Sequence, residues 1–500
     1  MKFRTIFLFL ALVELTSLAG YFFPILNAVG FFVIVAAALV LSMQRLEYGL
    51  YFALADLILG GRNGALFSFQ AGGFFLSLRM ALFIVVMAVW GAKVVSARLH
   101  NAPQPPLNLR GGVLKWWTVL GLAVAWGMVV GLVRGNGFGN VFLDANGYFY
   151  AALVLPVMWC MRRIDHESET NAARMASGVR GVFFAATTLL ALKTLFAVYL
   201  FTHAGNNFIA SNLVAFYRWV RDTAVGEITW LDGNFARVFF QSHVYNVVAF
   251  FVVLASLITP PTSPYLKGRK LILWTLLVLN ASVIIVSLSR SFWIGTIAGL
   301  GVIGVAVVVM GPIGRIERIS RIIKILGVTL LAAIALIFFV SRFPFPHPSP
   351  ADLGDAARSR LEAGDAGKSR FNLLPPLMRA IVMHPIIGSG FGKTVTYISN
   401  DPRIREVNRT GQYTTYAFEW GWLDLWLKMG VLGLIGLIGL ISQIGLTLYR
   451  KARSNSTSLA GFALLAALAS INVFTPYLNH PLGLGILMLL TIVAEYDSMI

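Results

Sequence analysis

Long uninterrupted apolar runs recur along this chain and constrain its fold more than any other feature of the sequence. A run of about 18 apolar residues is long enough to cross a bilayer as a helix. Because 58% of the residues are hydrophobic and only 12% are charged, against about 25% charged in soluble domains, the sequence predicts an all-α polytopic membrane protein. About 12–14 transmembrane helices are expected, near residues 4–20, 21–42, 49–60, 74–94, 115–133, 146–161, 180–201, 243–259, 270–287, 291–311, 322–341, 420–448, 457–476 and 483–496.

Basic residues fall in alternate connections between these expected helices. With the N-terminus in the cytoplasm, the cytoplasmic connections are those at Arg45, Lys93 to Lys115, Arg162 to Arg180, Lys267 to Lys270, Arg315 to Lys324, and Arg450 to Arg453. This distribution satisfies the positive-inside rule and predicts that both termini are cytoplasmic. The net charge of +19 then reflects these loops and their contact with anionic membrane lipids, and predicts no nucleic-acid partner.

One connection on the opposite face is unusually long and runs from about residue 342 to 418. Connections of more than about 15 residues are uncommon and are usually functional. Its stretch FNLLPPLMRAIVMHP has the apolar spacing of a short surface helix. We therefore divide the chain into N-terminal transmembrane helices (1–230), central transmembrane helices with arginine-bearing turns (231–341), a long extracytoplasmic loop (342–418) and C-terminal transmembrane helices (419–500).

Many arginines lie on this outer face, where the positive-inside rule does not place them. Arg290, in VIIVSLSRSFWIGTIAGL, falls at a break between two expected spans, and Arg237, in DGNFARVFFQSHVYN, falls just ahead of a span. A guanidinium group matches phosphate oxygens bidentately, so arginines converging there predict a diphosphate whose lipid tail lies in the bilayer. For any single outer arginine the alternative is solvation or pairing with an acid. The outer arginines are Arg62, Arg134, Arg218, Arg221, Arg237, Arg290, Arg358, Arg360, Arg370, Arg379, Arg403, Arg405 and Arg409.

Four charged residues within apolar segments have simple explanations as pairs. Asp424 and Lys428 are spaced i, i+4, which is typical of an ion pair on one helix face. Arg79 and Lys193 lie in the middle of expected spans, and we expect them to form buried pairs or to extend to the interface. These residues therefore predict structure rather than chemistry.

Glu419 lies at the outer end of an expected span, and aromatic residues flank it at Phe418, Trp420 and Trp422. Apolar surroundings would raise its pKa towards the range of a general base. A structural carboxylate is the alternative, and Asp232, Asp401 or Glu406 could act as the base instead. No cofactor or protein-bound metal is predicted, because the single cysteine is Cys160 and no histidines stand at metal-ligand spacing.

The order of these features resembles the O-antigen ligase and polymerase family of bacterial inner-membrane glycosyltransferases. The resembling features are an arginine before a mid-chain span, an SR turn between two later spans, the outer-loop stretch MRAIVMHPIIGSGFG, and an acid about eleven residues before GVLGL. The resemblance covers about residues 230–445.

This resemblance implies a C-type glycosyltransferase fold in the bacterial cytoplasmic membrane. Such an enzyme is metal-independent and inverting, and at the outer face it moves a glycan from an undecaprenyl-diphosphate donor to a hydroxyl acceptor on a glycan or glycolipid. The diphosphate-binding role falls on Arg237, Arg290 and Arg370, with Arg134, Arg62 and Asp232 as secondary candidates. Glu419 stands where the ligases commonly carry a catalytic histidine, so ligase and polymerase both remain open. The alternative function is a transporter or flippase of lipid-linked sugars or anions, which would also require intramembrane charges.

Overall fold

The structure is a computed structural model that describes residues 3–61, 63–72, 74–100, 112–162, 168–204, 207–231, 233–258, 270–310, 315–345, 351–362, 364–453 and 455–495. Eleven helices within these ranges are long and apolar enough to cross a membrane. Two further apolar helices, Lys270–Val286 and Pro481–Glu495, are shorter. The prediction of a polytopic, mostly helical membrane protein is confirmed.

The first half of the chain contributes helices and one hairpin. Its elements are α1 (Phe3–Phe22), α2 (Pro24–Gln44), α3 (Leu46–Leu59), β1 (Ser68–Ala71), β2 (Phe74–Ser77), α4 (Leu78–Leu99), α5 (Val113–Val133), α6 (Phe138–Phe149), a 3-10 turn (Tyr150–Leu153), α7 (Val154–Arg162), α8 (Ser168–Thr202) and α9 (Asn207–Asp222). The apolar run at 49–60 forms the short helix α3.

The second half contributes the remaining spans and two more hairpins. Its elements are β3 (Gly226–Trp230), β4 (Ala236–Phe240), a 3-10 turn (Gln241–His243), α10 (Val244–Ile258), α11 (Lys270–Val286), α12 (Arg290–Met310), α13 (Arg315–Arg342), α14 (Leu353–Glu362), α15 (Gly364–Met383), β5 (Val395–Ile398), α16 (Pro402–Val407), β6 (Gln412–Thr415), α17 (Gly421–Lys451), α18 (Ser456–Phe474), a 3-10 turn (Tyr477–Asn479) and α19 (Pro481–Glu495).

The helices pack closely around a buried centre formed by α10, α18 and α19. Helix α12 packs along α18, and α17 packs along α5. A Cβ atom added at Gly299 of α12 would lie 3.0 Å from the carbonyl oxygen of Ala463, so this glycine permits the close approach of α12 to α18. Lys193 pairs with Glu14 at 2.6 Å and Arg79 pairs with Asp56 at 2.7 Å, as predicted for buried pairs.

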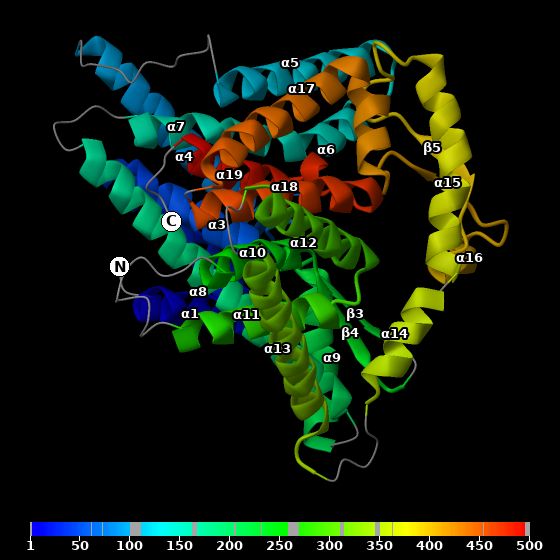
Figure 1. The fold of residues 1–500 in the computed structure, drawn as a ribbon. Helices are drawn as coiled ribbons and strands as arrows, with labels where there is room; N and C mark the ends of the chain where they lie inside the picture. Colours follow the sequence, from blue (N-terminus) through cyan, green and yellow to red (C-terminus); the bar gives the residue numbers. More distant parts are fainter. Residues whose placement is uncertain are drawn as a thin grey trace.

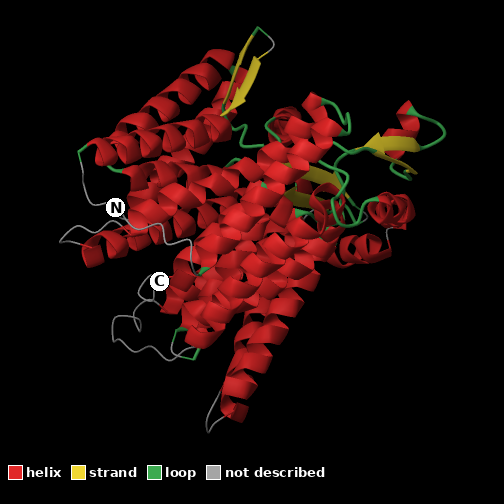
Figure 2. Ribbon diagram, turned by 90° about the horizontal axis from the view of Figure 1, so that it is seen from above, coloured by secondary structure: helices red, strands yellow, loops and turns green. Residues whose placement is uncertain are grey.

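The described residues form three antiparallel hairpins, which Figure 2 shows as yellow arrows at separate places; β3–β4 and β5–β6 lie towards the end of the bundle on the right of Figure 1. Helices α14 and α15 run across the same end, along the right of Figure 1 and opposite the labels of the two chain ends. The Lys93 Nζ atom in the last turns of α4 donates to the carbonyl oxygen of Met43 near the end of α2, 2.8 Å away. Parts of the connections predicted to be cytoplasmic, among them residues 101–111, 163–167 and 259–269, lie outside the described residues.

The predicted surface helix in the long connection is present as α15, which begins earlier than its apolar stretch. One face of this helix buries three residues at i, i+4, i+8 spacing, namely Leu373, Leu377 and Ile381. They form a small separate core with Val395, Phe418 and Leu427. This core fixes α15 against the start of α17.

Candidate active site

A cavity of about 1,100 Å³ opens at the end of the bundle where the β3–β4 and β5–β6 hairpins lie. Its walls come from the β3–β4 hairpin, the beginning of α12, α14, α15, the β5–β6 hairpin and the residues just before α17 and α19. Residues from about 200 to 480 therefore meet in one space, although the sequence places them in separate connections.

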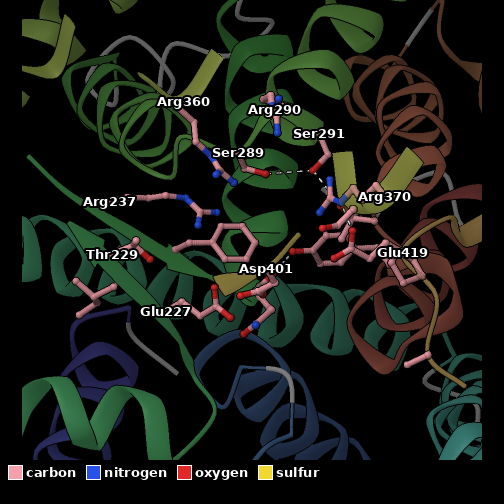
Figure 3. Close-up of a pocket in the computed structure, with 18 of the residues that line it drawn as sticks. Glu227, Thr229, Arg237, Ser289, Arg290, Ser291, Arg360, Arg370, Asp401 and Glu419 are labelled. Atoms are coloured by element: carbon pink, nitrogen blue, oxygen red, sulfur yellow. Dashed lines mark hydrogen bonds and ion pairs between the residues drawn. The ribbon is translucent and has the colours of Figure 1, made fainter. Parts of the chain in front are cut away.

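Four arginines line this cavity, each from a different element: Arg237 from β4, Arg290 from α12, Arg360 from α14 and Arg370 from α15. Figure 3 shows the side chains of Arg237, Arg290 and Arg360 around one part of the cavity, with Arg370 beside Glu419 on the other side. Among the described residues, Arg237, Arg290 and Arg360 form no ion pair. Their positive charges are therefore free to meet an anionic ligand.

Arg237 is the most rigidly held member of this cluster. Its Nε donates to the carbonyl oxygen of Ser287 at 2.8 Å, and its guanidinium lies 4.6 Å from the centre of the Phe239 ring. Burial, and secondly the nearby charge of Arg360, lower the pKa of Arg237 to about 10, so the group stays charged at neutral pH. The pKa of Arg360 is also lowered, first by burial and then by the charges of Arg290 and Arg370. Cations held this close together favour an anion between them.

The SLSRS turn places a helix N-terminus beside these arginines. Leu288 has a φ of 45°, which reverses the chain after α11, and the backbone N–H of Trp293 donates to the carbonyl oxygen of Ser289 at 3.1 Å as α12 begins. The hydroxyl oxygens of Ser289 and Ser291 lie 3.1 Å apart on the cavity wall. Because the N-terminus of a helix carries partial positive charge, the beginning of α12 adds positive potential to this part of the cavity.

Three carboxylates line the cavity: Glu227 of β3, whose charge acts on both Arg237 and Arg360, and Asp401 and Glu419. Glu419 forms an ion pair in which the Arg370 Nε donates to its Oε2. The Glu419 side chain is 52% exposed. The prediction that its aromatic neighbours would enclose it in apolar surroundings is therefore wrong. The reason is that these rings point elsewhere: the Trp420 Nε1 donates to the carbonyl oxygen of Arg370 and the Trp422 Nε1 to that of Ala469.

The remaining walls of the cavity are apolar and aromatic. The end of α8, helix α9 and strand β3 contribute Phe201, Leu213, Val214, Tyr217 and Trp230. Tyr397 and Tyr413 face each other across the β5–β6 hairpin, with ring centres 6.0 Å apart. The cavity thus offers a cationic part, a part with carboxylates and aromatic rings, and an apolar side.

The other predicted site residues divide into three groups. Asp401 lines the cavity, whereas Glu406 lies exposed on α16 and does not. Arg134 follows the last turn of α5 and is not among the cavity residues. Arg62 and Asp232 lie outside the described residues. Within the part of the chain that the structure describes, no group of three or more His, Cys, Asp or Glu side chains is placed to hold a metal ion.

Sequence reasoning did not select Arg360, Ser289, Ser291, Tyr477 or His480, all of which line the cavity. Arg360 stood in the sequence as one outer arginine among many. Its only distinguishing signal is that it lies two positions after the exposed Arg358 on the same short helix, so the two face different directions. Nothing in the sequence pattern distinguished Ser289, Ser291, Tyr477 or His480 as site residues.

A buried charge network connects α6, α17 and the glycine-rich turn after α15. The Lys428 Nζ lies 2.5 Å from a carboxylate oxygen of Asp424, as predicted, and 2.5 Å from one of Asp144, which was not predicted. The second oxygen of Asp144 accepts from the backbone N–H of Gly392 at 2.9 Å. This contact ties the glycine-rich turn after α15 to α6 and α17.

That glycine-rich turn, GSGFGK, is structural. Gly388, Gly390 and Gly392 all have positive φ, between 75° and 82°. The Phe391 N–H donates to the carbonyl oxygen of Gly127 at 3.0 Å, so the turn is wedged against α5. The segment is therefore a tight turn that follows α15 and is fixed against α5.

Comparison with known families gives one match. Residues 275–438 match the model of the O-antigen ligase family. This segment runs from within α11 to within α17 and includes Arg290, Arg360, Arg370 and Glu419, whereas Arg237 precedes it. No curated protein matches the chain. The match confirms the resemblance that the sequence motifs indicated over this segment.

Proposed function

We propose that this protein is a membrane glycosyltransferase of surface-polysaccharide synthesis. It transfers or polymerises a glycan from an undecaprenyl-diphosphate donor onto a hydroxyl acceptor of a glycan or glycolipid. The observation that carries the proposal is the convergence of Arg237, Arg290 and Arg360, all without ion-pair partners among the described residues, at the N-terminus of α12. The O-antigen ligase match over residues 275–438 supports the same reaction class.

The donor's three chemical parts fit the three parts of the cavity. The diphosphate lies between the arginines and the beginning of α12, where their donors match its oxygens. The polyprenyl chain follows the apolar side of the cavity formed by α8 and α9. The sugar extends towards Tyr397 and Tyr413, whose rings can stack on its apolar faces.

The reaction is a single displacement at the anomeric carbon. The acceptor hydroxyl oxygen attacks this carbon, its proton passes to a Glu419 carboxylate oxygen, and the bond from the carbon to the phosphate oxygen breaks. The electron pair leaves with undecaprenyl diphosphate, whose growing negative charge the arginines stabilise without a metal ion. One displacement from the opposite face inverts the anomeric configuration.

The charge distribution supports an orientation for this chemistry. The alternation of basic connections along the sequence favours a cytoplasmic location for them, and the arginine-lined cavity is then assigned to the opposite face. The active site then faces outward, with both termini inside a bacterial cytoplasmic membrane. In this arrangement residues 1–230 and 419–500 form the flanking helices, 231–341 carry the arginine-bearing turns, and 342–418 form the outer loop that covers the site.

The test is glycan transfer in proteoliposomes from an undecaprenyl-diphosphate-linked donor. Glu419→Gln and Arg290→Ala are expected to lose at least about a hundredfold in rate, because each removes a group acting in the transition state. Arg379→Ala, on an exposed face of α15, is the matched control and should retain the wild-type rate. Wild-type rates in both site variants would refute the assignment. Movement of the intact lipid-linked glycan across the bilayer without transfer would instead support a transporter.

A further inference from the structure

Two residues with separate proposed roles are bound to each other in this structure. Arg370 is a proposed ligand of the diphosphate and Glu419 is the proposed base, yet the Arg370 Nε donates to the Glu419 Oε2. This pair occupies the Nε of Arg370, which would otherwise donate to the diphosphate, and one of the roughly four lone-pair sites of the Glu419 carboxylate. In this structure, the Nε of Arg370 is therefore bound to Glu419 and not available to an anionic ligand.

Arg370 differs from the other three cavity arginines in having this partner. Arg237, Arg290 and Arg360 form no ion pair among the described residues, whereas Arg370 forms one at a place where its own side chain is 31% exposed. Exposed ion pairs are weak, worth only a fraction of a hydrogen bond to a charged ligand in a less solvated site. An entering diphosphate can therefore draw the guanidinium away from Glu419.

The backbone around this pair is fixed, so only the side chains need to move. The Trp420 Nε1 donates to the carbonyl oxygen of Arg370 at 3.0 Å, and its ring packs against Phe371 with centres 5.9 Å apart. The small core under α15 holds the helix itself. Arginine has a long flexible side chain, so its head can change partner while its Cα stays in place.

We infer that Arg370 exchanges partners during the reaction, and this inference rests on the proposed function. In the free enzyme Arg370 holds Glu419, and on donor binding it turns to the diphosphate. The exchange frees the Glu419 Oε2 atom, so that this oxygen can accept the proton of the acceptor hydroxyl when the donor is bound.

The test measures the affinity of the purified full-length protein in nanodiscs for undecaprenyl diphosphate. Removing the competing carboxylate with Glu419→Gln should tighten binding by about two- to fivefold, the range that corresponds to losing one exposed ion pair. Arg370→Ala should weaken binding. Glu419→Gln made in the Arg370→Ala background should bring no further gain, because the partner exchange no longer exists. Glu406→Gln and Arg379→Ala, both exposed and outside the cavity, are the matched controls.

Each other outcome contradicts the inference in a recognisable way. A gain that persists in the Arg370→Ala background would come from general charge repulsion and not from Arg370. No gain from Glu419→Gln, or no loss from Arg370→Ala, would mean that Arg370 does not change partner. Failure of the proposed function looks different: the wild type would not bind the probe, or Arg290→Ala would bind it as tightly as the wild type.

Discussion

The network around Lys428 gives the sharpest prediction about stability. The side chains of Lys428, Asp144 and Asp424 are 4%, 6% and 5% exposed, and one ammonium group bridges both carboxylates. Lys428→Met fills similar volume but leaves two carboxylates buried without a cation. Removing one partner from a buried ion pair costs about 3–5 kcal/mol. For a chain of this length, with an unfolding entropy of about 1 kcal/mol/K, that loss lowers the melting temperature by about 3–5 °C.

The assay is thermal unfolding of the purified protein in nanodiscs, followed by tryptophan fluorescence. Lys115→Met removes an exposed lysine at the start of α5 and is the control, with an expected change within about 0.5 kcal/mol.

A second variant separates charge from packing. Adding Asp144→Asn and Asp424→Asn to Lys428→Met removes the uncompensated charges, and the amide oxygens can still accept from Gly392 and Asn479. Replacing a whole buried ionic group by neutral residues is often close to neutral, so this triple variant should recover most of the lost stability. The reasoning would be refuted if Lys428→Met had the melting temperature of the wild type. It would also be refuted if the triple variant were no more stable than Lys428→Met.

Two further predictions concern the site and its support. Arg360→Ala should reduce glycan transfer about tenfold or more by weakening diphosphate binding, whereas Arg358→Ala on the exposed side of α14 should not; equal effects would remove Arg360 from the site. Gly390→Ala should cost about 1–3 kcal/mol, because φ is 81° and the new Cβ would overlap the backbone nitrogen of Gly131. Gly139→Ala, where a Cβ meets nothing within 4 Å, is the control in the same melting assay, and equal melting temperatures would contradict the wedged-turn description.

The sequence predicted features that depend on local pattern. Apolar runs located the spans because a bilayer requires about 20 apolar residues in each crossing helix. The i, i+4 spacing predicted the pairing of Asp424 with Lys428, and the break between two spans drew attention to Arg290, which lines the cavity.

Features that depend on distant contacts were not predictable in the same way. Asp144 meets Lys428 across 284 positions of sequence, and Arg370 meets Glu419 across 49. The β3–β4 hairpin that carries Arg237 is formed by two five-residue strands, which are too short to stand out from the apolar segments around them. Without those contacts, neither the exposure of Glu419 nor the place of Arg360 could be inferred.

The central claim is that the cationic part of the cavity recognises a diphosphate. The most direct measurement compares glycan transfer in proteoliposomes from two donors that differ only in carrying an undecaprenyl diphosphate or an undecaprenyl monophosphate. The account predicts transfer from the diphosphate donor and a rate at least about a hundredfold lower from the monophosphate donor, because Arg237, Arg290 and Arg360 together supply more donors than one phosphate can use. Equal rates from the two donors would contradict it.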